Sequence, residues 1–174
     1  ELIMCGVAGI GRHGLPVEGA GRLVAAMGER MASRGPDGGG VASHPDAALG
    51  MRRLAIVDLV GGQQPMSSDD GTIVLVYNGE VYNAPALRQR LVEEGVSFRT
   101  RSDTEVVLRL YERDPESVEE HLAGMWAFAI HDRRRGRLVL SRDGFGIKPL
   151  FLARGEAGLA FASALSFSIR SEHT

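Results

Sequence analysis

The sequence predicts an α+β fold with antiparallel sheets. Segments with strand character and segments with helix character come in blocks rather than in strict alternation, which favours antiparallel over parallel pairing. The length of 174 residues corresponds to one domain, and no stretch of linker composition divides it. With 44% hydrophobic and 24% charged residues, the composition is typical of a globular protein rather than of a disordered or fibrous chain.

The first elements are a strand and a helix. Small and apolar residues alternate over residues 5–11, a pattern that predicts a short buried strand with close backbone packing. A helix should follow, ending at about Ala32, because apolar residues recur there at helical spacing. These residues are Leu23, Val24, Met27 and Met31.

A run of strands comes next. The glycine-rich residues 34–40 break the pattern and predict a loop, and two strand-like stretches follow at 41–44 and 48–57. Residues 72–77 are β-branched and apolar and give the strongest strand signal in the chain. Asn78-Gly79 directly after this strand predicts a turn.

The second half begins with helices and returns to strands. Residues 82–85 open a helix, with Pro85 at a tolerated early position, and Ser102 with Glu105 predicts a capping box at the start of the next helix. Asp114-Pro115 starts a short helix. The strands expected after it are residues 125–131, 138–141, 150–153 and 159–163.

Charge and hydropathy exclude several classes of protein. With 20 basic and 22 acidic residues there is no basic surplus to attract nucleic acid, and the arginine run 133–137 is interpreted as a solvated hairpin tip. The longest apolar runs fall far below the ~18 residues of a membrane span, and no leader resembles a secretion signal. We therefore expect a soluble, cytoplasmic protein that binds neither nucleic acid nor membrane.

The single cysteine, Cys5, is the candidate nucleophile. One cysteine cannot form an internal disulfide, the five histidines are scattered, and no metal-binding spacing occurs. Cys5 follows Met4, and removal of that methionine would give the thiol an α-amino group of its own, with an ordinary pKa of about 7.7–8.0, as a base. Asn78-Gly79 could offer an amide and a backbone N–H to an oxyanion. The alternative is that Cys5 is a small buried hydrophobic residue.

Six motifs stand in order along the chain and together resemble a known family. They are Cys5-Gly6-Val7-Ala8-Gly9, Arg34-Gly35-Pro36-Asp37, Arg53-Leu54-Ala55-Ile56-Val57-Asp58, Tyr77-Asn78-Gly79-Glu80-Val81-Tyr82-Asn83, Ser102-Asp103-Thr104-Glu105 and Arg142-Asp143-Gly144-Phe145-Gly146-Ile147-Lys148-Pro149-Leu150. The chain resembles the glutaminase domain of glutamine-hydrolysing asparagine synthetases, a class II glutamine amidotransferase domain of the N-terminal-nucleophile hydrolase type. This resemblance implies a four-layer αββα sandwich of two antiparallel sheets flanked by helices.

The resemblance also implies catalytic roles. Cys5 attacks the side-chain amide of L-glutamine to give a glutamyl thioester and ammonia, and its own α-amino group carries the proton. The Asn78 side chain and the Gly79 N–H form the oxyanion hole. The domain itself needs no cofactor; ATP and Mg belong to a synthetase domain or subunit that accepts the ammonia, and the protein could form a homodimer.

Substrate-binding roles follow in the same way. Arg53 holds the glutamine α-carboxylate, Asp103 with Glu80 holds the α-ammonium group, and backbone around Ile56 and Val57 lines the pocket. Each residue has a plain alternative: Arg53 and Glu80 as solvated surface charges, Asp103 as part of a helix cap, and Asn78-Gly79 as a simple turn.

The sequence departs from the family pattern at several places. Residues 1–4 form a leader, an expression scar or a propeptide, that makes the Cys5 nitrogen an amide; 5–165 form the glutaminase domain, and 166–174 an uncertain tail. Arg101 replaces a usual glycine, and Ala164 and Ser166 replace the usual Glu and Lys. No Ser-Gly-Gly-x-Asp-Ser loop for ATP occurs, so the synthetase half is absent. The alternatives are a catalytically degenerate regulatory or scaffold domain, or a class II amidotransferase that feeds another acceptor.

Overall fold

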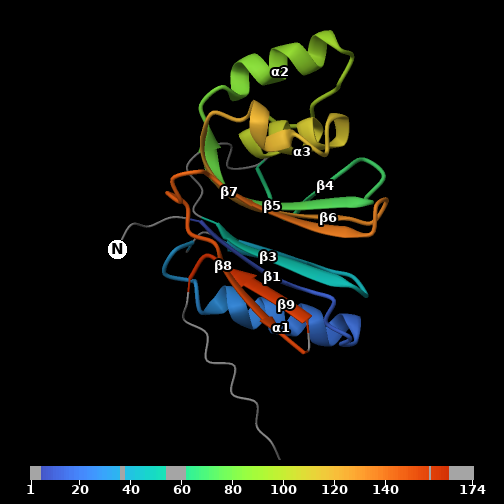
Figure 1. Ribbon diagram of the computed structural model, residues 1–174, viewed down its shortest axis with the longest axis vertical. Coiled ribbons are helices and arrows are strands. Elements are labelled where there is room, and N and C mark those ends of the chain that lie inside the picture. Colours follow the sequence, from blue (N-terminus) through green and yellow to red (C-terminus); the bar gives the residue numbers. More distant parts are fainter. Residues whose placement is uncertain (1–4, 36–37, 54–61, 157, 165–174) are drawn as a thin grey trace, which may run out of the picture.

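Four layers make up the architecture of the chain (Figure 1). A computed structural model describes residues 5–35, 38–53, 62–156 and 158–164. Helix α1 (Val17–Glu29) covers one sheet, a second sheet packs on the first, and helices α2 (Ala84–Glu93) and α3 (Asp103–Arg113) cover the second sheet. Every strand pair in these residues is antiparallel. The predicted α+β class and the four-layer order are confirmed.

The five-stranded sheet next to α1 contains the strand that follows Cys5. Its order is β2-β3-β1-β9-β8. The bounds are Gly6–Gly11 (β1), Gly38–Ser43 (β2), Ala47–Arg53 (β3), Phe151–Gly155 (β8) and Gly158–Ala162 (β9). Strand β1 lies in the middle, paired with β3 on one side and with β9 on the other. Cys5 therefore leads directly into the central strand of this sheet.

The four-stranded sheet carries the Asn78-Gly79 motif. Its order is β4-β5-β6-β7. The bounds are Met66–Ser67 (β4), Ile73–Val81 (β5), Gly124–Asp132 (β6) and Arg137–Arg142 (β7). Strands β5 and β6 pair without interruption from Ile73 opposite Asp132 to Val81 opposite Gly124. Both faces of β5 are covered, by helices on one side and by the other sheet on the other, which explains its continuous apolar run.

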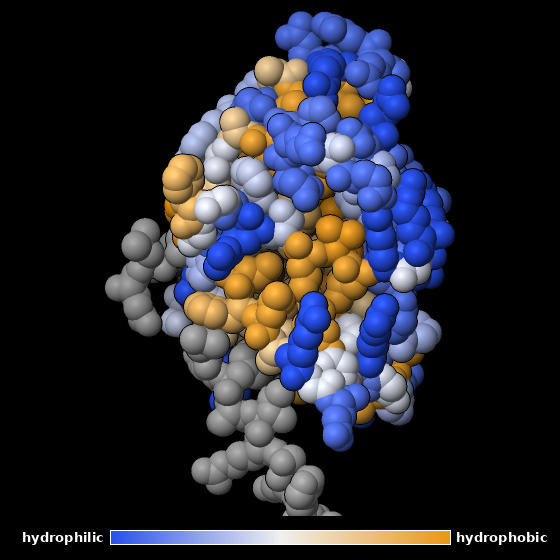
Figure 2. Space-filling model, in the orientation of Figure 1, coloured by the Kyte–Doolittle hydropathy of each residue, from blue (hydrophilic) through white to orange (hydrophobic). Residues whose placement is uncertain are grey.

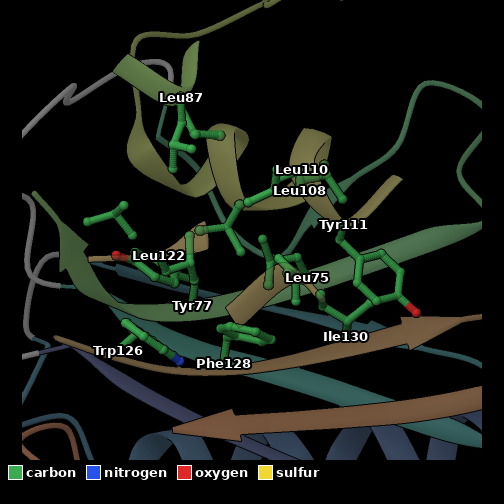
Figure 3. Packing of buried hydrophobic residues seen from close by; sticks show 14 of the residues in the cluster. Leu75, Tyr77, Leu87, Leu108, Leu110, Tyr111, Leu122, Trp126, Phe128 and Ile130 are labelled. Atoms are coloured by element: carbon green, nitrogen blue, oxygen red, sulfur yellow. The ribbon is translucent and has the colours of Figure 1, made fainter. Parts of the chain in front are cut away.

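Three apolar cores hold the layers together. The largest lies between the four-stranded sheet and the helices α2 and α3, with the 3-10 turn η1 (Val118–His121) at its border (Figure 3). A second joins α1 to β1 and β3, and a third fills the space between the two sheets. Within the five-stranded sheet, Gly9 leaves room for its cross-strand partner, because a Cβ at Gly9 would lie 2.4 Å from the Phe161 ring. Gly9 therefore marks a close approach rather than a turn.

The glycine-rich segment after α1 differs from its prediction. Residues 38–40 are not loop, because β2 begins at Gly38. A Cβ at Gly39 would lie 2.6 Å from the Met51 carbonyl oxygen, and one at Gly40 would lie 2.6 Å from the Gln64 carbonyl oxygen. These two glycines permit close backbone approach within a strand, which composition alone cannot distinguish from a turn.

Two helix predictions also need correction. In α1 the buried stripe runs through Ala20, Val24 and Met27, whereas Leu23 is 42% exposed, so Leu23 is not on the face that packs on the sheet. The short helix expected from Asp114-Pro115 is instead a 3-10 turn that begins at Val118.

Strands β7 and β8 are the outer edges of their sheets. Every residue of β8 is exposed, including the hydrophobic Phe151 and Leu152. Figure 2 shows hydrophobic surface gathered on this side of the molecule. None of the described helices is long and apolar enough to cross a membrane.

Candidate active site

Cys5 lies at the start of β1, on the side of the strand that faces the other sheet. As the single cysteine of the chain it forms no internal disulfide, and it is half-buried. Along β1 the side chain of Val7 packs between the sheets, whereas those of Ala8 and Ile10 pack toward α1. Alternation therefore assigns Cys5 to the inter-sheet face, and Cys5 indeed packs against the inter-sheet core.

Arg53 is the cross-strand neighbour of Cys5. The β1–β3 register places Gly6 opposite Arg52, so the next pair outward is Cys5 and Arg53. Met51, two residues earlier in β3, packs between the sheets, and alternation places Arg53 on the same face as Cys5. The fold thus brings together two residues that lie far apart in the sequence.

Asn78-Gly79 does not form the predicted turn. Both residues lie inside β5, where Asn78 pairs with Ala127 and Gly79 with Trp126. Pairing with β6 over the whole length of β5 outweighs the local turn preference of Asn-Gly. The chain leaves the strand only after Val81, just before α2.

The side chain of Asn78 holds a buried donor that no described residue satisfies. Asn78 is 3% exposed, and its Nδ2 makes no hydrogen bond with the described part of the chain. Val74 and Val76 pack between the sheets, so alternation directs Asn78 to the same inter-sheet space as Cys5. An unsatisfied buried donor costs about 1–3 kcal/mol, which calls for a functional explanation.

The backbone N–H of Gly79 points away from β6. On the far edge of β5 the N–H of Tyr77 donates to Gln64 Oε1 at 2.6 Å, and the N–H of Val81 donates to Asp103 Oδ2 at 3.1 Å. Antiparallel hydrogen bonding alternates along a strand, so the Gly79 N–H lies on this same edge, between the two side-chain acceptors. Gly79 also has no room for a side chain, because a Cβ would lie 2.4 Å from the Met125 carbonyl oxygen.

Asp103 approaches this edge from the first position of α3. Its Oδ2 accepts the hydroxyl hydrogen of Tyr77 at 2.8 Å as well as the Val81 N–H. Ser102 caps the helix through its Oγ, which accepts from the Thr104 N–H at 3.1 Å. Ser102 is therefore the capping residue of α3, and helix capping does not explain why an aspartate stands at position 103.

The predicted capping box is only half formed. Glu105 does not reach back to the Ser102 N–H; its buried carboxylate accepts instead from the N–H groups of Arg99 and Thr100. Burial by itself would raise the pKa of Glu105, but these hydrogen bonds and Arg109 outweigh it and lower the pKa. The carboxylate holds the segment that leads into α3, and thereby the position of Asp103.

The phenol of Tyr77 marks the centre of the cluster. Burial, the hydrogen-bonded Asp103, and the neighbouring Glu80 and Cys5 all raise the pKa of Tyr77. Three predicted site residues from three segments therefore act on one hydroxyl group. Glu80 itself is exposed, on the strand next to Gly79.

The buried carboxylate of Asp143 anchors the loop after β7, a role that the sequence motif alone did not reveal. Asp143 is buried and accepts backbone N–H groups of Trp126, Phe145, Ile147 and Lys148. These bonds tie the loop after β7 to the β6 residue that pairs with Gly79. The signal was Asp143 itself, an acidic residue directly before a glycine-rich stretch.

The remaining predicted residues, Ile56 and Val57, lie outside the described residues. Among the described residues, no group of three or more His, Cys, Asp or Glu side chains is placed to hold a metal ion. Cys5 and Asn78 face the same inter-sheet space, Arg53 continues the β1–β3 register next to Cys5, and the Gly79 N–H and Asp103 share one edge of β5. Such a set suits a substrate that carries a carbonyl to be attacked and charges of both signs.

Comparison with known proteins decides the family. A family model described as "Glutamine amidotransferase domain" matches residues 4–173. The chain belongs to this family. The resemblance drawn from the six motifs is confirmed.

The relatives of this glutamine amidotransferase domain are much longer proteins. The chain is 38% identical over 174 residues to glutamine-hydrolyzing asparagine synthetase 2 of Bacillus subtilis (strain 168), covering 98% of this chain and 23% of the relative. It is 40% identical over 138 residues to the glutamine-hydrolyzing asparagine synthetase of Asparagus officinalis, covering 79% of this chain and 23% of the relative. The chain thus spans less than a quarter of the length of these two relatives.

A solved structure shares the fold. The glutamine phosphoribosylpyrophosphate amidotransferase from B. subtilis superimposes with a TM-score of 0.72 at 24% identity, covering 91% of this chain and 42% of that chain. At this identity the likeness shows the fold of the amidotransferase domain alone.

Proposed function

We propose that the domain hydrolyses the side-chain amide of L-glutamine at Cys5. The observation that carries the proposal is the buried Nδ2 of Asn78, which lacks a partner among the described residues and lies in the inter-sheet space that Cys5 also faces. A tetrahedral oxyanion next to the thiol would supply the acceptor that this donor lacks. The Gly79 N–H is the second donor of the hole.

The chemical steps use groups of this chain only, with no cofactor. When Cys5 is the first residue, its α-amino group takes the thiol proton as the sulfur attacks the amide carbon, and the carbonyl electrons move to the oxygen held by Asn78 and Gly79. Collapse breaks the C–N bond, and the α-amino group of Cys5 transfers a proton so that ammonia leaves and a thioester remains. Water then attacks the thioester, which releases glutamate and returns the proton to the sulfur.

Charged groups around the thiol fit the two ends of an amino acid. Arg53, the cross-strand neighbour of Cys5, would hold the α-carboxylate, for which a guanidinium offers two parallel donors. Asp103 and Glu80 would hold the α-ammonium group. Backbone around Ile56 and Val57 would complete the pocket.

The ammonia would pass to an ATP-dependent module of the asparagine synthetase type. This part of the proposal is supported by the names and the greater length of the curated relatives. ATP and Mg would belong to that module, and the residues described here do not select its acceptor substrate.

Glutamate release tests the proposal. A chain that begins at Cys5, here called the parent, should convert glutamine to glutamate, and Cys5→Ala should abolish the reaction while the fold is kept. Ser163→Ala is the matched control, because it removes one atom from another small side chain near β1, whose Oγ accepts from the Val7 N–H at 3.0 Å. This control should retain turnover. Absence of turnover by a folded parent would overturn the proposal and favour a regulatory or scaffold role.

A further inference from the structure

The side chain of Tyr77 extends along β5 over Gly79. Its side chain is 2% exposed and lies on the helix-facing side of the strand, as Gly79 does two residues later. A Cβ at Gly79 would lie only 2.8 Å from the Tyr77 hydroxyl oxygen. The missing side chain at Gly79 thus opens the space through which the phenol reaches Asp103.

The phenol and the strand hold one oxygen of the Asp103 carboxylate. Oδ2 accepts from the Tyr77 hydroxyl at 2.8 Å and from the Val81 N–H at 3.1 Å. These two donors belong to the residues on either side of Gly79 along the strand edge. Both donors engage the same oxygen, so the carboxylate keeps Oδ1 as the acceptor that it can present to a ligand.

We propose that Tyr77 is a positioning residue that holds the Asp103 carboxylate for the α-ammonium group of the substrate. The inference rests on the proposed function, which makes that substrate an α-amino acid amide. An ammonium group needs an acceptor with a fixed direction, and a carboxylate tied at one oxygen to two donors presents its other oxygen in one orientation. The phenol therefore contributes to selectivity without touching the reacting amide.

The electrostatics of the cluster keep the phenol in its donor form. Burial and the hydrogen-bonded Asp103 raise the pKa of Tyr77, so the hydroxyl stays protonated throughout the working pH range. Asp103 accepts the Val81 N–H on the same edge of β5 on which the N–H of Gly79, the proposed oxyanion donor, lies. An ammonium group bound at Asp103 is then part of the same site as the attacked amide.

The chain offers a matched control in Tyr111. This second phenol belongs to the same apolar core and donates to Asp132 at 2.9 Å. Figure 3 shows Tyr77 and Tyr111 at opposite ends of the cluster. Tyr77→Phe and Tyr111→Phe each delete one buried hydroxyl that donates to a carboxylate, but only the first deletion lies at the site.

The test compares two substrates that differ in a single group. Glutaramate has the amide and the carboxylate of glutamine but lacks the α-ammonium group. Tyr77→Phe should lower kcat/KM for glutamine about tenfold, mainly through a higher KM, and leave kcat/KM for glutaramate unchanged. Tyr111→Phe should leave both values unchanged. Both variants are assayed below their thermal midpoints, so that the folded fraction is the same.

The outcomes separate this inference from the function on which it rests. An equal fall of kcat/KM for both substrates in Tyr77→Phe would show a merely structural role and overturn the inference. Unchanged values for both substrates would overturn it as well. A folded parent that hydrolyses neither substrate would overturn the proposed function, and this inference with it.

Discussion

Replacing Asn78 with leucine should make the domain more stable and inactive. Leucine has nearly the same shape as asparagine but no polar group, so the buried donor for which the described part of the chain offers no partner disappears. The unsatisfied group costs about 1–3 kcal/mol, and we expect the free energy of unfolding to rise by about 1 kcal/mol, because apolar atoms replace it in a packed space. Loss of an oxyanion donor should lower kcat by roughly 10²–10³-fold.

The measurements are urea unfolding followed by Trp126 fluorescence, and initial rates of glutamate release. Asn83→Leu is the matched control, because Asn83 Nδ2 donates to the His121 carbonyl at 2.9 Å and Oδ1 accepts from the Ala123 N–H at 2.9 Å. That variant should lose about 1–3 kcal/mol of stability and keep its kcat. A destabilised Asn78→Leu variant would show that the unsatisfied donor does not cost stability. A kcat within about threefold of the parent would show that Asn78 does not act as an oxyanion donor.

Two further substitutions test how the site is built. Gly79→Ala should lose about 1–3 kcal/mol of stability in urea unfolding, because its Cβ would lie 2.4 Å from the Met125 carbonyl oxygen. This oxygen belongs to the backbone of β6, which cannot move aside as a flexible side chain can. Unchanged stability would show that β5 and β6 separate without cost. Burial alone would raise the pKa of Asp143, but four backbone N–H groups outweigh it and lower the pKa below 3.8. The stabilisation by Asp143 is therefore present above about pH 4 and lost as pH falls through the lower folded-state value, so Asp143→Asn should be less stable at pH 7 and lose less stability on acidification. Parallel stability curves for the variant and the parent would contradict this.

The order of strands and helices followed largely from local patterns, and the clearest failure is the turn predicted at Asn78-Gly79. Alternation of small and apolar residues predicted β1, and the β-branched run predicted the start of β5. Asn78-Gly79 was predicted as a turn because that dipeptide favours one locally. The turn is absent because β6 offers a partner to every residue of β5, a contact from a segment more than forty residues away.

The candidate site could be named from the sequence but not assembled from it. Cys5 stood out as the single cysteine, whereas its proximity to Arg53 depends on the register of β1 and β3. The contact of Tyr77 with Asp103 crosses from a strand to a helix and leaves no trace in either segment alone. The roles predicted for these residues, and for Ile56 and Val57 outside the described residues, stay predictions.

The most direct test of the central claim is whether Cys5 acts as an N-terminal nucleophile on glutamine. Intact mass is measured after exposure to a diazoketone analogue of glutamine, for chains that begin at Glu1 and at Cys5. We predict one adduct, formed with loss of N₂ and located on Cys5, only in the chain that begins at Cys5. Equal labelling of both chains would contradict the role of the α-amino group as the base. No labelling of either folded chain would contradict the assignment of Cys5 as the nucleophile.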